Sequence, residues 1–357
     1  MPLAVASTND FGLRLLARLG PGQLVFSPLG VHAALSTLRG GATGEARAAL
    51  DAVLGDDAPV ISVEEEAVEL ALAQGVWIDQ EYRLADTFRA AADRRGVAWR
   101  SLNFSDPAAP EIVNAWAAEK TRGMIPRIVD AFQRDEKLAL ADAAYFEGGW
   151  TVPFDPDRTE ERPFTRPDGS TVAVATMSAE DDFDYAEDGE HLAIRLRYGD
   201  LGELAFVAVM AREGVEAPPP ESAVWDDLRF ESRPGRVELP RVAAESRFEL
   251  GDPLKALGLG PAFAPGADFD GLFEGPAPAK SLSRVLHRAR VDVDEAGTRA
   301  AAVTVVTARA VSLPARPPEP FELRLDRPFL WAIEHRPTGT LLFLGRVTDP
   351  STSEEST

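Results

Sequence analysis

The sequence predicts an α+β fold in one domain, with helices packed on large mixed β-sheets. Apolar residues recur at helical spacing up to about residue 132, and short strand-like runs begin at about residue 138. Helices and strands do not alternate as they would in βαβ units. Of the 357 residues, 45% are hydrophobic, which is enough for a large core. We therefore expect one domain over residues 1–350 and an acidic tail over residues 351–357.

Five segments of the first part have the apolar spacing and end signals of helices. They are residues 9–19, 28–39, 43–54, 107–118 and 124–132. We expect Asn9 or Asp10 to cap the first of them. The acidic run Glu64-Glu65-Glu66 is interpreted as a solvated helix face.

Strand signals dominate the rest of the chain. Runs bounded by glycine, proline or aspartate predict strands at residues 138–146, 171–177, 193–196, 204–210, 236–239 and 248–250. A short helix at residues 253–257 interrupts them. Longer strand-like runs follow at residues 288–293, 300–311, 321–325, 329–334 and 340–347. The proline-rich stretches at 218–220 and 315–320 are interpreted as loops, because strand signals resume on both sides of each.

Composition excludes several classes of function. The chain has 37 basic and 58 acidic side chains, a net charge of −21, so it would repel a phosphate backbone, and we expect no nucleic-acid partner. The absence of cysteine excludes a disulfide framework, a thiolate zinc site and a thiol nucleophile. The four histidines show no metal-binding or catalytic spacing. We expect no cofactor, no metal and no catalytic residue, and therefore not an enzyme.

No membrane association is expected either. The longest apolar stretch, residues 204–211, is far shorter than the roughly 20 residues that span a bilayer. The first residues lack the basic and apolar regions of a secretory signal. The sequence predicts a cytoplasmic protein, with the alternative that a signal was trimmed before the numbering begins.

The most unusual segment runs from Asp294 to Ser312. If it forms a strand, one face carries only small or β-branched side chains, from Thr298 onward, while Arg299 and Arg309 share the other face. The tract is long for a strand, and several prolines follow it. This pattern favours a segment that can be either a loop or a central strand.

Motifs along nearly the whole chain resemble those of the serpin family. They are Phe26-Ser27-Pro28 with the later GGATGEA, Asn114-Ala115-Trp116 with KTRGMI, LADAAYFEGGW over residues 140–150, Glu295-Ala296-Gly297-Thr298 with the alanines after it, DRPF over residues 326–329 and LFLGRV over residues 342–347.

The resemblance implies a metastable suicide inhibitor of serine proteases. A protease would cleave an exposed reactive-centre loop, at about residues 295–320, and the loop would insert into the central sheet and trap the acyl-enzyme. The hinge of that loop would comprise Glu295, Gly297, Thr298, Ala300 and Ala302. The alternative is a non-inhibitory serpin-like carrier, chaperone or storage protein. The small uncharged hinge residues favour the inhibitor, because a charge buried there would cost several kcal/mol.

The resemblance also implies two control points in the sheet. The first, the breach gate, would comprise Trp150, Arg241 and Glu295 at the top of the sheet. The second, the shutter cluster, would comprise Ser27, Asp142 and His287 beneath its middle.

In the shutter cluster the sequence departs from the family pattern. Asp142 stands where an asparagine is usual, and Gly30 stands where a second serine is usual. A charged Asp–His pair would make opening of the sheet sensitive to pH.

The reactive bond is expected at Val311–Ser312. In inhibitory serpins the stretch from the hinge acid to the cut usually spans about seventeen positions, which carries the protease to the far pole of the sheet at about 3.3 Å per residue. Counted from Glu295, that length ends at Val311, which suits an elastase-like or subtilisin-like protease. Cleavage after Arg309 by a trypsin-like enzyme, or after Leu313 by a chymotrypsin-like enzyme, remains open.

We expect a monomer that forms a covalent complex with such a serine protease. The stretch between Leu54 and Leu72 is short relative to the family and contains no basic cluster. The helix that carries heparin sites in some animal serpins is therefore expected to be trimmed, and no glycosaminoglycan site is expected.

Overall fold

The structure is a computed structural model that describes residues 3–65, 67–215, 225, 228–275, 281–298 and 319–351. Its helices are α1 (Leu3–Leu16), α2 (Pro28–Arg39), α3 (Gly44–Leu54), α4 (Asp86–Arg94), α5 (Ala109–Lys120), α7 (Gly251–Leu254) and α8 (Gly260–Phe263), with short turns η1 (Pro156–Arg158) and η2 (Lys255–Leu259). Its strands are β1 (Leu24–Phe26), β2 (Val68–Asp79), β3 (Ala98–Leu102), β4 (Leu138–Gly149), β5 (Glu160–Thr165), β6 (Thr171–Glu187), β7 (His191–Tyr198), β8 (Leu204–Ala211), β9 (Glu231–Pro240), β10 (Val242–Glu249), β11 (Arg284–Val293), β12 (Gly297–Thr298), β13 (Phe321–Arg324), β14 (Phe329–His335) and β15 (Thr340–Val347).

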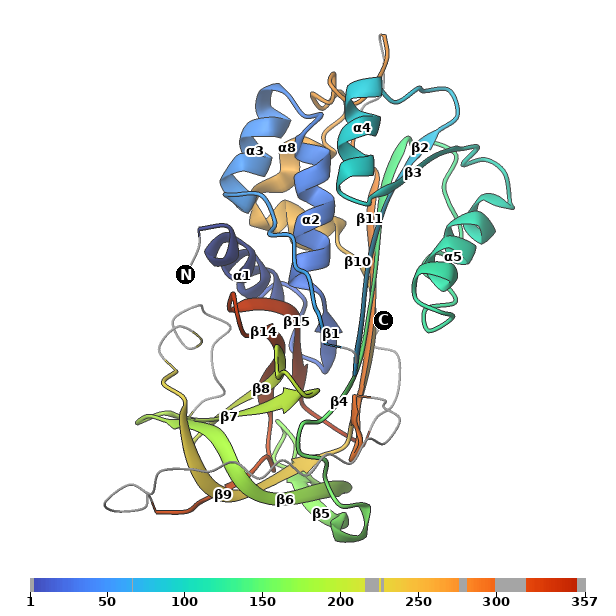
Figure 1. Cartoon of the computed structure of the whole chain (residues 1–357). Helices are drawn as coiled ribbons and strands as arrows, with labels where there is room; N and C mark the ends of the chain where they lie inside the picture. Colours follow the sequence, from blue (N-terminus) through green and yellow to red (C-terminus); the bar gives the residue numbers. More distant parts are fainter. Residues whose placement is uncertain are drawn as a thin grey trace.

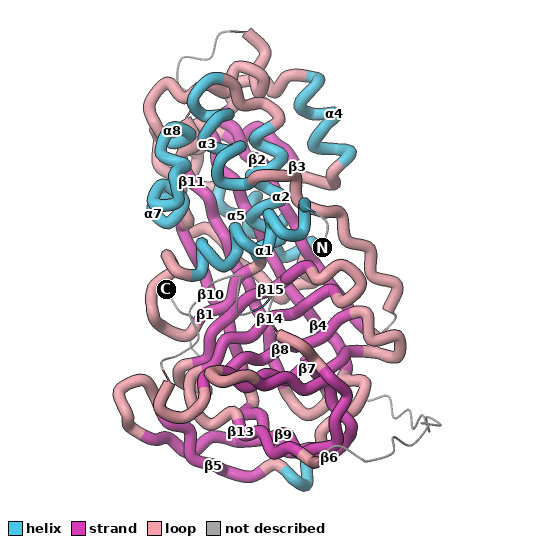
Figure 2. The backbone as a smooth tube through the Cα atoms, turned by 90° about the vertical axis from the view of Figure 1, so that its left-hand side faces the viewer, coloured by secondary structure: helices cyan, strands magenta, loops and turns pink. Residues whose placement is uncertain are grey.

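The strands of the described residues form two sheets. One is nine-stranded, in the order β1-β15-β14-β8-β7-β6-β9-β13 with β5 beside β6. The other is six-stranded, in the order β10-β11-β4-β2-β3 with β12 also paired to β4. Figure 1 shows the six-stranded sheet from its edge, with α5 on one side and α1, α2 and α3 on the other. In Figure 2 the strands β5, β6, β9 and β13 lie at the end of the molecule away from these helices.

Three large apolar clusters fill the space between these layers. The first joins α1, α2 and α3 to the six-stranded sheet and includes the fully buried Phe11. The second lies between the two sheets around Trp331, and the third lies under α5 around Trp116. The six-stranded sheet is therefore packed on both faces, which is why β4 is apolar along almost its whole length.

Helix α2 passes across the middle of the molecule, and its start is well defined by the sequence. The side chain of Ser27 accepts a hydrogen bond from Gly30 N–H. Pro28 occupies the first helical position, where a backbone N–H would have no partner within the helix. The predicted boundaries of this helix and of α3 are confirmed to within a residue.

Two predicted details of the helices are wrong. Helix α1 begins at Leu3, so neither Asn9 nor Asp10 caps it. Instead, the side-chain amide of Asn9 donates to Gly339 O and accepts from Leu341 N–H, and so fixes α1 to β15. Residues 124–132 form no helix. The amide oxygen of Asn114 accepts the backbone N–H groups of Ile128 and Val129, which holds that stretch in an irregular path against α5.

The segment between α3 and β2 also differs from the prediction. Glu64 and Glu65 lie outside any helix, and Glu65 is buried. Its carboxylate accepts the backbone N–H groups of Asp200, Leu201 and Gly202 at 2.7–3.2 Å. This carboxylate therefore fastens the segment to the turn between β7 and β8.

The predicted strands after residue 138 match observed strands, except residues 300–311, which lie outside the described residues. Strands β2 and β3 were not predicted. Of the expected acidic tail, only Ser351 lies among the described residues. Within the described part of the chain, no helix combines the length and apolarity needed to cross a membrane.

Candidate functional site

The feature that singles out the six-stranded sheet is the position of β12. Strand β11 runs parallel to β4, and their pairing ends at Arg290 opposite Tyr145. The chain then reverses, and Gly297 and Thr298 pair antiparallel with the last two residues of β4. Gly297 and Thr298 of the expected hinge thus occupy the end of the β4 edge that β11 pairs, beyond the point where the pairing with β11 stops.

Gly297 makes this reversal possible. Its φ of +146° lies in a region that other residues rarely adopt. A Cβ atom at this position would lie 2.1 Å from the carbonyl oxygen of Gly148. The turn is closed by Asp294 N–H, which donates to Gly297 O at 2.7 Å. Any side chain here would push β12 away from β4.

Thr298 is fully buried between the two sheets. Its hydroxyl shares a hydrogen bond of 2.7 Å with the hydroxyl of Tyr198 at the end of β7. Tyr198 stacks on Trp150, with ring centroids 4.5 Å apart. Burial raises the pKa of Tyr198 well above its usual value, so the phenol stays neutral and suits a neutral partner.

Trp150 holds the turn before β12 by two hydrogen bonds. Its indole Nε1 donates to Asp294 O at 2.8 Å, and its backbone N–H donates to Ala296 O at 3.0 Å. The two acceptors flank Glu295 on either side. The tryptophan therefore fixes the backbone of the residue that begins the expected hinge.

Arg241 binds the side chain of Glu295. Its Nε and Nη2 atoms donate to the carboxylate at 2.7–3.1 Å. Thr159 Oγ1 donates to the same carboxylate at 2.5 Å. Although burial by itself would raise it, these hydrogen bonds from Arg241 and Thr159 hold the pKa of Glu295 below its usual value. The carboxylate is only 9% exposed, so this is not a solvated surface pair of the kind that contributes little. The structure thus places Trp150, Arg241 and Glu295 together.

The other expected group, the shutter cluster, lies across the seam between β4 and β11. Asp142 and His287 face each other in the register of the two strands. His287 Nδ1 lies 2.7 Å from Asp142 Oδ2, and both side chains are buried. Because Ser27 N–H donates to Nε2 at 3.1 Å, the ring proton resides on Nδ1 and is donated to the carboxylate. The hydroxyl of Ser27 donates to Leu342 O, so the cluster also touches the nine-stranded sheet.

The two departures from the family pattern meet in space. A Cβ atom on residue 30 would lie 2.5 Å from both carboxylate oxygens of Asp142. The second oxygen also accepts a hydrogen bond of 2.9 Å from Gln74 in β2. The carboxylate therefore fits only because residue 30 is glycine, and the two positions act as one unit.

Comparison with known proteins identifies the family to which this arrangement belongs. The model of the family described as Serpin (serine protease inhibitor) matches residues 6–350. The chain belongs to the serpin family. Among curated relatives of this serpin, Serpin-Z1C of Triticum aestivum is 32% identical over 98% of this chain and 96% of its own length. Plasminogen activator inhibitor 1 of Neovison vison is 29% identical over 97% of this chain and 93% of its own.

Solved structures show the same fold. Tengpin, a thermophilic serpin solved in its native state, superposes with a TM-score of 0.84 at 25% identity, covering 97% of this chain and 94% of its own. Thyroxine-binding globulin in complex with thyroxine superposes with a TM-score of 0.82 at 22% identity, covering 97% and 99%. The relatives thus include a protein named as an inhibitor and one named for ligand binding.

Part of the predicted serpin site is not visible. Val311, Ser312, Ala300 and Ala302 lie outside the described residues, as do the alternative cleavage positions. Sequence reasoning missed three residues that complete the visible part, namely Thr159, Tyr198 and Gln74. Only their position in the fold reveals them, because each reaches its partner from a strand or turn far away in the chain.

Proposed function

We propose that this serpin is a suicide inhibitor of serine proteases that inserts its cleaved loop between β11 and β4. The observation that carries the proposal is β12. Its two residues already pair with the last two residues of β4, in the antiparallel direction that a loop entering from the end of β11 must take. A longer insertion would extend β12 along β4, so the later loop residues would run in the direction that the chain already has at Thr298.

Full insertion requires that the seam between β4 and β11 open. The two strands pair over seven positions, from Arg284 opposite Ala139 to Arg290 opposite Tyr145. An inserted strand would replace these bonds by hydrogen bonds on both of its edges, each contributing about 0.5–1.5 kcal/mol net. Over a dozen residues this gain can exceed the roughly 5–15 kcal/mol that stabilises an ordinary domain. The uninserted form is therefore held kinetically.

The hinge side chains support insertion rather than storage or transport. Thr298 is buried and its polar atom is paired, so the first inward-facing position of the inserted strand carries no unpaired charge. By strand parity Ala300 and Ala302 would follow on the same face. Each is small enough to enter without separating the two sheets.

The chemical step is an interrupted acyl transfer. The serine oxygen of the protease attacks the carbonyl carbon of Val311, the bond to Ser312 breaks, and the proton is delivered to the new amine of Ser312. The ester to Val311 is left intact while the loop inserts. Valine at this position suits an elastase-like or subtilisin-like target, whereas cleavage after Arg309 or Leu313 would indicate a trypsin-like or chymotrypsin-like one.

Incubation with proteases of these four classes tests the proposal. We expect a complex that survives a denaturing gel, formed by a monomeric inhibitor, and a released peptide that begins at Ser312. A peptide beginning at Ala310 or Pro314 would move the reactive bond while leaving the inhibitor proposal standing.

A matched variant separates inhibition from simple cleavage. Thr298→Arg places a charge against Tyr198, where burial makes it costly, so this variant should be cleaved at the same bond without trapping the protease. We expect every protease only to cleave this variant. If the same is found for the unaltered chain, the alternative of a non-inhibitory carrier, chaperone or storage protein replaces the proposal.

A further inference from the structure

A pocket of about 350 Å³ lies where the ends of α2, α3 and α4 meet. This is the end of the six-stranded sheet opposite to β12 (Figure 1). Four arginines line it, Arg39, Arg47, Arg94 and Arg95, against a single acidic residue, Asp57. In a chain with 58 acidic and 37 basic side chains, such a local excess of positive charge is unusual.

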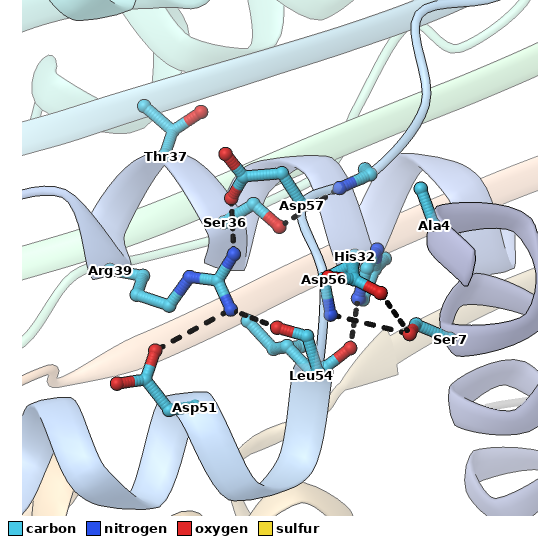
Figure 3. Close-up of polar contacts among 12 residues, drawn as sticks. Ala4, Ser7, His32, Ser36, Thr37, Arg39, Asp51, Leu54, Asp56 and Asp57 are labelled. Atoms are coloured by element: carbon cyan, nitrogen blue, oxygen red, sulfur yellow. Dashed lines mark hydrogen bonds and ion pairs between the residues drawn. The ribbon is translucent and has the colours of Figure 1, made fainter. Parts of the chain in front are cut away.

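Arg39 is held in a fixed position at the base of this arginine pocket. Its side chain is only 9% exposed. Nη1 donates to Gly55 O at 2.5 Å and lies 3.5 Å from Asp51 Oδ1 (Figure 3). A guanidinium fixed in this way loses little conformational freedom when it binds an anion, because that freedom was lost on folding.

Asp57 shows what the arginine pocket can bind. Arg39 Nη2 donates to one of its carboxylate oxygens, and Arg95 Nη2 donates to the other at 2.6 Å. Asp57 belongs to the segment between α3 and β2, and its side chain is 51% exposed. Two guanidinium groups from separate elements thus converge on one oxyanion that is itself open to solvent.

The remaining arginines leave positive charge unused. Arg47 Nε is paired with Asp51, which sits on the same helix. Among the residues that the structure describes, Arg94 has no ion-pair or hydrogen-bond partner. Each guanidinium has five N–H donors, so one carboxylate cannot use the donors of the four groups. Ser36 and Thr37 add hydroxyl groups to the same lining.

We propose that the arginine pocket binds a small oxyanion with two or more negative charges, of the phosphate or pyrophosphate type, next to Asp57. Arginine groups match the oxygens of such anions in pairs, and the fork of donors favours phosphate over monovalent chloride. The ligand offsets the charge of the four arginines that Asp51 and Asp57 together leave unbalanced.

The sequence did not reveal this pocket because its arginines form no run. They come from α2, α3 and the end of α4, whereas the stretch between Leu54 and Leu72 contributes only the acid. A long sulfated polysaccharide is a different ligand from the one proposed, because the proposed ligand is small enough to lie within a pocket of about 350 Å³, whereas a polysaccharide lies along a surface.

Calorimetric titration of the full chain with pyrophosphate, at ionic strength held constant with sodium chloride, tests the proposal. We expect saturable binding to one site. Asp57→Asn removes the competing charge and frees donors of Arg39 and Arg95 from a carboxylate, so the affinity should rise about fivefold or more. A gain in affinity cannot result from a folding defect.

Two further variants complete the test. Arg94→Gln should weaken pyrophosphate binding about threefold or more, whereas Arg158→Gln, which breaks an exposed pair with Glu180 far from the pocket, should leave it unchanged. The proposal would be overturned by any of three results. The heat of titration would depend on ionic strength alone, or Asp57→Asn would leave the affinity for pyrophosphate unchanged, or the chain would bind a sulfated polysaccharide but not pyrophosphate. The assay uses no protease, so its result is independent of the inhibitory function.

Discussion

His32 links three helices through one buried ring. Its Nε2 atom donates to Leu54 O at the end of α3, and its Nδ1 atom lies 3.1 Å from the hydroxyl of Thr8 in α1. Burial lowers the pKa of His32 to about 4. The ring is therefore neutral in the folded chain at neutral pH. Protonation would place a charge in the buried site and remove Nδ1 as an acceptor for the hydroxyl of Thr8.

The lowered pKa of His32 predicts how stability depends on pH. Because the unfolded chain takes up a proton near pH 6.5 and the folded chain only near pH 4, stability is lost as pH falls between these values, by on the order of 3 kcal/mol. In His32→Gln the urea midpoint should fall less over that interval. The pKa of His335 is also lowered by burial, but His335 is less completely buried, so His335→Gln should flatten the curve less than His32→Gln does. Parallel curves for the unaltered chain and His32→Gln would contradict the prediction.

Asp142 and His287 predict a second pH dependence, this time of a rate. Protonation of His287 at Nε2 would remove the acceptor of Ser27 N–H and leave two N–H groups facing each other. The ring is otherwise enclosed by Phe26 and Phe248, so no other titrating group contacts it among the described residues.

We expect the seam between β4 and β11 to open faster at pH 5 than at pH 8, because a proton on Nε2 of His287 would oppose the N–H group of Ser27 and remove a hydrogen bond next to the seam. Unfolding rates measured over this range should change several-fold in the unaltered chain and less in Asp142→Asn. Identical profiles for the two proteins would remove the shutter cluster as the cause.

At the scale of elements, the turn between β11 and β12 predicts the effect of a charge reversal. Arg241→Glu places a second carboxylate against Glu295, so the turn should detach and the sheet should convert faster to a latent or polymeric form. The half-life of monomer on warming, followed by native gel, measures this. Arg212→Glu, which reverses a more exposed pair with Glu187 in the nine-stranded sheet, should leave the half-life unchanged.

The same turn has a pH limit. The pKa of Glu295 in the folded chain is lowered from its unfolded value of about 4.5. The ionised Glu295 therefore stabilises the turn above pH 4.5, and this stabilisation is lost as pH falls through the lower pKa of the folded state. Conversion in acid should therefore be faster in the unaltered chain, while Glu295→Gln should show a flatter dependence on pH.

The elements that the sequence predicted correctly are those whose local pattern agrees with their packing. Helix α2 has an N-cap serine, a proline at its first turn and glycines after its end, and strand β15 is an apolar run after a turn. After its first residue, β2 continues with Glu69-Leu70-Ala71, residues that favour a helix, yet the strand forms because it pairs with β4 from Val68 to Ile78. Its partners lie far away in the chain, so no local window contains the cause.

The candidate site divides in the same way. Glu295 and Thr298 could be predicted because their order in the chain is itself the motif, whereas the contact of Thr298 with Tyr198 could not. Glu65 shows the opposite error. A run of acids usually faces water, but this one accepts three backbone donors from a turn that contains Gly199 and Gly202, and only the fold supplies those donors.

For the whole molecule, the proposed inhibitory mechanism predicts that one cut stabilises the protein. Cleavage within residues 295–320 should raise the melting temperature by tens of degrees, because the inserted strand adds hydrogen bonds on both edges of the opened seam. Scanning calorimetry of the chain before and after limited proteolysis measures this. In Thr298→Arg the cleaved product should melt close to the uncleaved one, and a rise equal to that of the unaltered chain would contradict the role of the hinge.

The pairing of β1 with β15 has a consequence for how the protein is made. Leu24 pairs with Arg346, and β14 and β15 stand between β1 and β8 in the nine-stranded sheet. A ribosome releases the first of these strands long before the last, so the nine-stranded sheet cannot close during synthesis. Strands β4 and β11, in contrast, are both available earlier, together with the loop that follows them. Under the proposed mechanism, the newborn chain has to keep that loop out of the seam until the last strands of the nine-stranded sheet have been made, so the timing of translation would help to select the inhibitory form.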